Sequence, residues 1–419
     1  MLTKEENDML TCVGPGTPAG ELLRKYWHPL IPSIQIGMGE AKRAKLLGED
    51  LVVFRLEDGS VGVMDEHCPH RKASLAFGFV EEGGIRCAYH GWKFAPNGKC
   101  IDQPFEPEAS HFRDRIKQKA YRIEDFCGML WIYMGPEPAP LLPKYKLFNI
   151  RTGLRWIMYS DIKANWLQLV ENMHDGQHVY YLHGEMMKRR LGIDTLFARR
   201  PASIEFVKYE WGIIPKRTFV GKDGEVVKER GHPIVFPNLN YALPSPSGIT
   251  CNFFIPVDDT HSRFIALMFL PTDDHSEIEQ ELIPAVDGTP YVKTEKDYNM
   301  DNIHGTDLMA WETQGQILDR TQEHLGASDR GVAMYRLLLK REIEKVRRGL
   351  DPVGIHRENV TEVAALDIEN TIIDYNHHKK INKKFQDIAF KAVEKGEIPT
   401  EIIGFGGKVY SVPTARITT

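Results

Sequence analysis

Two short segments of the sequence each place one cysteine close to one histidine. Cys68 is followed two residues later by His70, and Cys87 is followed three residues later by His90. Sixteen residues separate the two pairs, which is enough to put them on two loops that face the same centre. Thiolate and imidazole ligands favour iron–sulfur or zinc sites, so these four residues predict a metal centre.

Two kinds of centre use two cysteines and two histidines. In a Rieske [2Fe–2S] cluster, the thiolates bind one iron and the imidazoles bind the other. Zn²⁺ can take the same four ligands in a tetrahedron, but zinc loops usually pair cysteine with cysteine. Because each loop here supplies one ligand of each type, we predict a Rieske cluster, with Cys68, His70, Cys87 and His90 as its ligands and zinc as the alternative. His67 is expected to point away from this centre.

A second group of ligands is predicted between residues 165 and 183, where a helix is expected. Three histidines and two carboxylates occur within these nineteen residues. Two neutral imidazoles and one carboxylate on one face of an iron leave other positions open, as in non-haem iron oxygenases. His174 and His178 are four apart and share a face of an α-helix, whereas His183 lies five after His178, which fits a helix that ends or carries a π-type bulge. Spacing alone therefore leaves the choice of histidines open.

Together the two motifs resemble those of the Rieske non-haem iron oxygenase α-subunit family. The pattern Asp175-x₂-His178-x₄-His183 follows the Cys–His pairs at the distance typical of that family. The resemblance implies that His178 and His183 bind a mononuclear iron, and that Asp175 bridges to a cluster-ligand histidine of a neighbouring subunit. Further segments resemble the phthalate-dioxygenase-like group and extend the resemblance over most of the chain: Gly14–Pro18, Arg24–Trp27, Gly48–Asp50 and Arg320–Gly326.

The resemblance also suggests the third iron ligand. The family pattern is an aspartate that opens a late helix, followed five residues on by glutamate and two further by glutamine. Asp307, Glu312 and Gln314 have this spacing, so we expect Asp307 to bind the iron, with Glu312 as the fallback. His174 is expected to pack or to support a ligand, and Glu171 is a candidate hydrogen-bond partner of the ligands.

The activity implied by the resemblance is that of the oxygenase component of a multicomponent enzyme. Electrons would pass through the [2Fe–2S] cluster to a mononuclear Fe(II) that activates O₂, and an aromatic substrate, with an aromatic carboxylate favoured, would be hydroxylated or dihydroxylated. The alternative is a monooxygenase that acts as an O- or N-demethylase or cleaves an ether. A pure electron carrier is disfavoured, because the chain continues far beyond the cluster motif and carries the second ligand set.

The expected partner proteins follow from the lack of a nucleotide-binding motif and from the electron path that the resemblance implies. No Gly-x-Gly-x-x-Gly follows a predicted strand, so NAD(P)H electrons are expected to arrive through a separate flavin and iron–sulfur reductase, directly or through a ferredoxin. Transfer between neighbouring subunits requires a head-to-tail interface, and such interfaces close into rings. The resemblance therefore implies a homotrimer or a multiple of it.

The elements that position these residues are predicted to form two domains. The boundary between them is expected near a proline-rich stretch, Gly135–Pro140. Short alternating runs and Asp-Gly, Gly-Gly and Asn-Gly turns before it predict a small antiparallel β domain. We predict a Rieske domain over residues 1–140, with its core at about 27–135 and an N-terminal helix, and a catalytic domain over 141–419. Strands between helices at 162–181 and about 306–346 predict an α+β fold, with an antiparallel sheet flanked by helices.

Composition restricts the remaining possibilities. The net charge of −5 offers no basic field for nucleic acid, and no run of about eighteen apolar residues predicts a membrane span. The first ten residues carry acidic side chains where a secretion signal would need basic and then apolar ones. Six cysteines in 419 residues are too few for a disulfide scaffold. We therefore expect a cytoplasmic protein that binds neither nucleic acid nor membranes.

Overall fold

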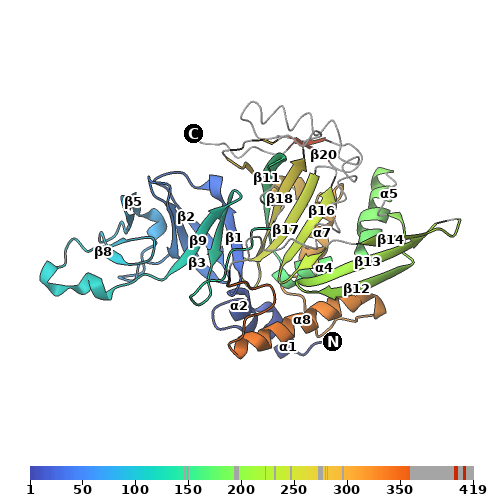
Figure 1. Ribbon diagram of the computed structural model, residues 1–419, viewed down its shortest axis with the longest axis horizontal. Helices are drawn as coiled ribbons and strands as arrows, with labels where there is room; N and C mark the ends of the chain where they lie inside the picture. The colour runs from blue at the N-terminus through green and yellow to red at the C-terminus, as the bar shows by residue number, and fades with distance from the viewer. Residues whose placement is uncertain are drawn as a thin grey trace.

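The computed structural model describes residues 1–358, 401–403 and 409–411, except 146–147, 149–150, 193–197, 222, 231–232, 246–247, 272–276, 279, 281 and 295–296. Two large sheets lie side by side along the long axis of the molecule, and a helical layer covers one edge of them (Figure 1). A smaller sheet extends from the N-terminal large sheet at one end of that axis. The rest of the predicted second domain, including 359–400, lies outside the described residues.

The N-terminal sheet is antiparallel and six-stranded, in the order β1-β10-β9-β4-β3-β2. Apolar runs form its central strands, and every residue of β10 is buried. Glycines at positive φ close the tight turns between strands, for example Gly48 and Gly128. The strands are β1 Trp27–Pro32, β2 Ala41–Leu46, β3 Glu49–Arg55, β4 Val61–Asp65, β9 Ala120–Phe126 and β10 Met129–Tyr133.

A four-stranded sheet, β5-β6-β7-β8, is inserted between β4 and β9. Its strands are short: β5 Phe79–Glu81, β6 Gly84–Arg86, β7 Lys93–Phe94 and β8 Cys100–Asp102. A separate cluster of buried side chains holds this insertion against the six-stranded sheet, and it includes Phe54, Cys68, Cys87, Trp92 and Cys100. The two predicted Cys–His pairs therefore lie on loops of the insertion.

The second large sheet has nine strands, in the order β12-β13-β15-β16-β17-β18-β11-β19, with β14 paired to β13. In the described part of this sheet, every pair of neighbouring strands is antiparallel except β11 with β19, which is parallel. The strands are β11 Gly153–Ile162, β12 Ser203–Tyr209, β13 Gly212–Val220, β14 Val226–Arg230, β15 Ile234–Val235, β16 Leu239–Ser245, β17 Gly248–Pro256, β18 Ser262–Pro271 and β19 Ala285–Asp287.

Helices from both ends of the described chain pack together. The N-terminal α1 and α2 contact α8, and α1 also contacts α4 (Figure 1). The helices are α1 Lys4–Thr11, α2 Pro18–Leu23, α4 Trp166–Met173, α5 Met186–Leu191, α6 Thr289–Val292, α7 Ile303–Thr313 and α8 Arg330–Arg347, with a π-helix, η5, at Val179–Glu185. None of the helices in the described part of the chain has the length and apolar character needed to cross a bilayer.

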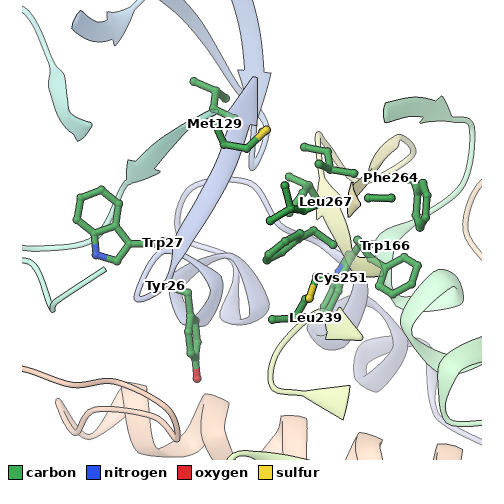
Figure 2. Packing of buried hydrophobic residues seen from close by; sticks show 14 of the residues in the cluster. Tyr26, Trp27, Met129, Trp166, Leu239, Cys251, Phe264 and Leu267 are labelled. Carbon is green, nitrogen blue, oxygen red and sulfur yellow. The ribbon is translucent and has the colours of Figure 1, made fainter. Parts of the chain in front are cut away.

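One hydrophobic core joins the two large sheets. Figure 2 shows Tyr26, Trp27 and Met129 near β1 close to Trp166, Leu239, Cys251, Phe264 and Leu267 of the second half, and all belong to one buried cluster. The core is therefore continuous across the proline-rich stretch near residue 140, and the predicted division of the chain there stays a prediction.

A buried ion network ties α4 to α8 and to the segment between α7 and α8. The Glu171 carboxylate accepts hydrogen bonds from Arg320 and Arg336, and Arg320 also donates to Asn7 of α1. Arg336 completes a second pair with Glu323. Charges buried this deeply are stable only when paired, so the network fixes α4, the helix that precedes the predicted iron ligands.

The predicted fold class is confirmed, whereas two predicted helices are wrong in their extent. The expected helix at 162–181 is shorter: β11 continues through Ile162, α4 covers only Trp166–Met173, and a π-helix follows after a break. The expected helix at 306–346 is two helices, because the chain turns at Gly315, where φ is +91°, and no α-helix resumes until α8 begins at Arg330.

Candidate metal centres

The two cysteine–histidine loops come together at the end of the inserted sheet. Both cysteine side chains are buried, while His70 is exposed and His90 is partly exposed. The two imidazole rings lie edge to face, with centroids 4.5 Å apart. Trp92 stacks on His70 at 4.4 Å. Two buried sulfurs behind two outward imidazoles match the ligand set of a Rieske cluster whose histidine-bound iron lies near the surface.

Both loops use the same backbone turn to present their ligands. The N–H of Lys72 donates to the Cys68 carbonyl at 2.9 Å, and that of Gly91 donates to the Cys87 carbonyl at 3.0 Å. The residue that closes each turn has a positive φ, +61° at Lys72 and +76° at Gly91. A side chain at Gly91 would also collide with Pro104, since a Cβ there would lie 2.8 Å from its ring. Glycine at this position is therefore required by the loop.

The other histidine and cysteines considered for this centre pack or form hydrogen bonds within the surrounding structure. The His67 Nδ1 lies 3.9 Å from the Asp65 carboxylate, and its backbone carbonyl accepts from Gln118. Cys100 is fully buried beside the cluster loops, and the Cys127 thiol donates to the carbonyl of Phe148. None of the six cysteines forms a disulfide.

The second predicted ligand group is also brought together. His178, His183 and Asp307 each offer one ligand atom, and these atoms lie within 4.8 Å of one another. In the part of the chain that the structure describes, this is the one group of three such side chains found. Two imidazoles and a carboxylate are the ligand types of a mononuclear non-haem iron site.

The π-helix brings two histidines five residues apart to one place. In an α-helix, residues five apart point about 140° from each other, whereas a π-helix, with its i→i+5 hydrogen bonds, brings them close to alignment. His178 caps η5 and His183 lies within it, and their ring centroids are 5.2 Å apart at an angle of 82°. The π-type feature expected from the spacing is therefore present.

Hydrogen bonds to Nδ1 orient both imidazoles. The Nδ1 of His178 donates to the Asp175 carbonyl, and the Nδ1 of His183 lies 3.2 Å from the Thr306 hydroxyl. A neutral imidazole with its proton on Nδ1 keeps the lone pair on Nε2 for a metal. Nε2 of His183 indeed faces the Asp307 carboxylate at 3.2 Å.

Charge and burial suit a cation between these three groups. Burial, with the neighbouring His183, lowers the pKa of His178 and keeps its imidazole neutral. Burial acts to raise the pKa of Asp307, but the facing histidines lower it overall, so the carboxylate is ionised. Its Oδ1 is buried and makes no hydrogen bond among the described residues. A buried carboxylate oxygen without a donor needs a cation, so the residues present fit an iron ion.

Glu312, the fallback ligand, faces elsewhere. Its carboxylate accepts from Lys293 at 2.9 and 3.0 Å, from the Tyr298 hydroxyl and from the Lys163 backbone. Asp307 does not open its helix as the family pattern suggested, because α7 begins at Ile303. The aspartate therefore lies one turn inside α7.

The other acids and histidines of the motif have different surroundings. His174 is fully buried, donates from Nδ1 to the Val170 carbonyl and packs on Tyr335, and burial lowers its pKa to about 4. Glu171 is committed to the buried ion network and not to the ligands. The Asp175 carboxylate is partly exposed, and its Oδ1 accepts the Gln177 N–H at 2.8 Å.

Sequence reasoning missed Thr306 and His304. Thr306 lies next to Asp307 and supports a histidine 123 residues earlier, a contact that no local pattern encodes. His304, one turn before Asp307, is buried close enough to that carboxylate for their charges to interact. Its position three residues before a predicted ligand was the available signal.

The two centres lie far apart within one chain. In Figure 1 the inserted sheet, with β5 and β8, forms one end of the long axis, while α4, α5 and α7 lie with the second large sheet in the other half of the molecule. The chain thus carries both ligand sets but does not bring them together.

Comparison with known proteins agrees with this geometry. Residues 26–120 match the family described as the Rieske [2Fe-2S] domain, and residues 292–397 match the LigXa C-terminal domain-like family. The chain is 38% identical to the oxygenase subunit of 5,5'-dehydrodivanillate O-demethylase from Sphingobium sp. strain SYK-6, over 85% of this chain and 84% of that protein. It is 31% identical to the phthalate 4,5-dioxygenase oxygenase subunit of Pseudomonas putida, with 84% and 89% covered.

The chain belongs to the Rieske non-haem iron oxygenase α-subunit family. Its fold also resembles the terminal oxygenase of carbazole 1,9a-dioxygenase from Novosphingobium sp. KA1, with a TM-score of 0.58 and 19% identity over 83% of this chain and 96% of that one. As a member of this family, the protein is the oxygenase component of a Rieske system. It uses a [2Fe–2S] cluster, a mononuclear iron and electrons supplied by partner proteins.

Single substitutions should distinguish the iron ligands of this Rieske oxygenase from neighbouring residues that do not bind the metal. We expect His178→Ala, His183→Ala and Asp307→Asn each to lower the iron content by about one third, the share of the mononuclear iron beside a two-iron cluster. The matched controls His174→Ala and Glu312→Gln should keep it. Metal analysis measures the loss, and the Rieske visible spectrum shows that the cluster remains. Loss of iron in His174→Ala without loss in His183→Ala would contradict the ligand set.

Proposed function

We propose that this oxygenase component oxidises an aromatic carboxylate, using His178, His183 and Asp307 as the ligands of its mononuclear iron. The group of three ligand atoms within 4.8 Å, with its unpartnered carboxylate oxygen, carries this proposal. Cys68 and Cys87, with His70 and His90, are the proposed ligands of the cluster, at the surface position where a partner can reach the imidazoles.

The chemistry of the site is divided between the metals and the residues. Iron, when bound, supplies the activation of O₂ with electrons delivered through the cluster. Thr306 and the Asp175 carbonyl hold the Nδ1 protons of the two histidines and so direct both Nε2 atoms inward. His183 and Asp307 are both buried, which limits the access of water to these two ligands.

Electron transfer is proposed to run between subunits. The two ligand sets lie in distant parts of one chain, whereas the exposed imidazole of His70 and the partly exposed carboxylate of Asp175 are both available to a neighbour. A carboxylate between two imidazoles accepts a hydrogen bond from each and links the two centres. Repetition of this contact head to tail closes a ring, for which we propose a homotrimer.

The electron donors are proposed to be separate proteins. Oxygenase components of carbazole 1,9a-dioxygenase have been solved in complex with a ferredoxin. For this chain we propose a flavin and iron–sulfur reductase that oxidises NAD(P)H, acting directly or through a ferredoxin. We also propose a cytoplasmic setting, where thiols stay reduced, because none of the six cysteines forms a disulfide.

The names of the relatives favour an aromatic carboxylate as substrate. Four relatives are named for dehydrodivanillate, phenoxybenzoate, phthalate and 3-chlorobenzoate, which are aromatic carboxylates, and a fifth is named for the aliphatic alcohols tert-butanol and tert-amyl alcohol. Hydroxylation or dihydroxylation of the ring is the first candidate reaction. O-demethylation is the second, because the relative with 38% identity is an O-demethylase subunit. Both reactions use the same iron site and differ in which substrate carbon lies over it.

Product analysis tests the function and separates the two reactions. Purified protein with a matched reductase, NADH and ¹⁸O₂ should oxidise at least one member of a panel of benzoates and methoxybenzoates. Ring dihydroxylation places two ¹⁸O atoms in the product, whereas O-demethylation releases formaldehyde. Removal of iron should abolish either product and Fe(II) should restore it. Full activity of the iron-free protein, or no oxidation across the panel by protein loaded with both metals, would contradict the proposal.

The substitution Asp175→Asn tests the proposed bridge. Asparagine keeps the size of the side chain but removes the charge that orients two imidazoles, so we expect the transfer of the cluster electron to slow by about 100-fold. Stopped-flow absorbance should follow reoxidation of the pre-reduced cluster after mixing with O₂ and substrate. Iron content should stay at the wild-type level. Wild-type reoxidation kinetics in the variant would remove Asp175 from the electron path.

A further inference from the structure

Two asparagines lie directly opposite each other on neighbouring strands of the nine-stranded sheet. Asn240 of β16 is paired in register with Asn252 of β17, and Asn252 is paired in turn with Ala266 of β18. Residues that face each other in register on adjacent strands point to the same side of a sheet. The two amides therefore form a polar pair on one face.

That face is the one that packs against the iron-site helices. Phe264, two residues before Ala266 and so on the same side of β18, contacts the ring of His304 in α7. Asn240 itself donates from Nδ2 to the sulfur of Met173, the last residue of α4. The asparagine pair thus lies between the sheet and the two helices that lead to the predicted iron ligands.

Both amide oxygens are buried without a partner. Asn240 is 6% exposed and Asn252 is 3% exposed, and neither Oδ1 accepts a hydrogen bond within the described structure. Leaving a buried acceptor unpaired destabilises a protein, and natural structures rarely contain two adjacent examples. Nδ2 of Asn240 already donates to Met173, so Oδ1 is the atom of this amide that remains to accept a hydrogen bond.

A nearby asparagine, Asn238, differs from this pair because its side chain has a hydrogen-bond partner within the sheet. Asn238, also buried, donates from Nδ2 to the carbonyl of Phe254 at 2.8 Å and ties β16 to β17. Its side chain has a structural role. The same face carries the buried apolar side chains Phe254, Phe264 and Met268 beside the buried hydroxyls of Thr250 and Ser262. Two unpaired acceptors next to aromatic side chains favour a ligand with a ring and a hydrogen-bond donor.

We propose that Asn240 and Asn252 form a substrate-recognition site that accepts a hydrogen bond from a phenolic hydroxyl on the aromatic ring. A carboxylate has no proton to donate, so it cannot satisfy these oxygens, whereas a ring hydroxyl can. The substrate class is thereby narrowed from aromatic carboxylates to hydroxylated ones. This inference rests on the proposed function, because it assumes that the layer between sheet and helices receives the substrate.

Ligand binding tests the inference without turnover. Isothermal titration calorimetry of the metal-loaded protein under anaerobic conditions should compare benzoate with 2-, 3- and 4-hydroxybenzoate. Sites built to pair with a hydroxyl discriminate strongly against analogues that lack it, so at least one isomer should bind about 10-fold or more tightly than benzoate. Equal affinity for benzoate and all three isomers in the wild type would overturn the proposal before any variant is made.

Variants then assign the preference to the two amides. Asn252→Leu and Asn240→Leu remove one acceptor each at similar volume, and each should reduce the preference for the hydroxyl to about 3-fold or less. The matched control Asn238→Leu removes a buried amide that has a structural partner and should keep the wild-type preference. An undiminished preference in both Asn252→Leu and Asn240→Leu, or its loss in Asn238→Leu alone, would overturn the assignment.

The outcomes distinguish this inference from the proposed function. Oxidation of aromatic carboxylates without any preference for a ring hydroxyl would leave the function standing and remove the recognition site. Hydroxyl-dependent binding that requires both asparagines, without oxidation of any bound ligand, would support the site and contradict the function.

Discussion

The geometry of the mononuclear site depends on one local constraint, the π-helical turn between His178 and His183. An ordinary α-helix would direct these side chains to different sides, and Asp307 on α7 would then face a single imidazole. Instead both rings converge, and the hydrogen bonds at Nδ1 leave the Nε2 sides for a metal. A π-helix is less favourable than an α-helix, so it must be held by its surroundings. The buried ion pairs of Glu171 with Arg320 and Arg336 anchor the helix that leads into it.

A second constraint is the separation of the two ligand sets within one chain, which affects how subunits would have to assemble. The inserted sheet lies at one end of the long axis, whereas the nine-stranded sheet and the helices with the predicted iron ligands lie in the other half of the molecule (Figure 1). A single chain therefore supplies both halves of an electron path without joining them. We therefore propose that electrons pass across an interface between subunits, and the partly exposed Asp175 is the residue through which we expect a neighbour to reach the iron site.

Prediction from the sequence worked best for the candidate metal ligands, because the types and spacing of these residues determine which metal they can bind. The two Cys–His loops, the His178 and His183 pair and Asp307 could all be predicted, because each motif is local or follows a family pattern. Long-range contacts could not. The hydroxyl of Thr306 on His183, the salt bridges of Glu171 and the opposition of Asn240 and Asn252 join residues from different elements, and their pairing depends on strand register and helix packing. The prediction of one helix over about 306–346 was wrong, because the chain turns at Gly315 and α8 begins only at Arg330.

Mixed oligomers test the central claim, electron transfer from the cluster of one subunit to the iron of the next. Chains with Cys68→Ser, which lack the cluster, and chains with His178→Ala, which lack the iron, are each expected to be inactive. Co-expression with two affinity tags yields oligomers that contain both, and some of their interfaces join an intact cluster to an intact iron site. The account predicts that these purified mixed oligomers oxidise the substrate. Verified mixed oligomers that contain both metals and remain inactive would show that the electron travels within one chain.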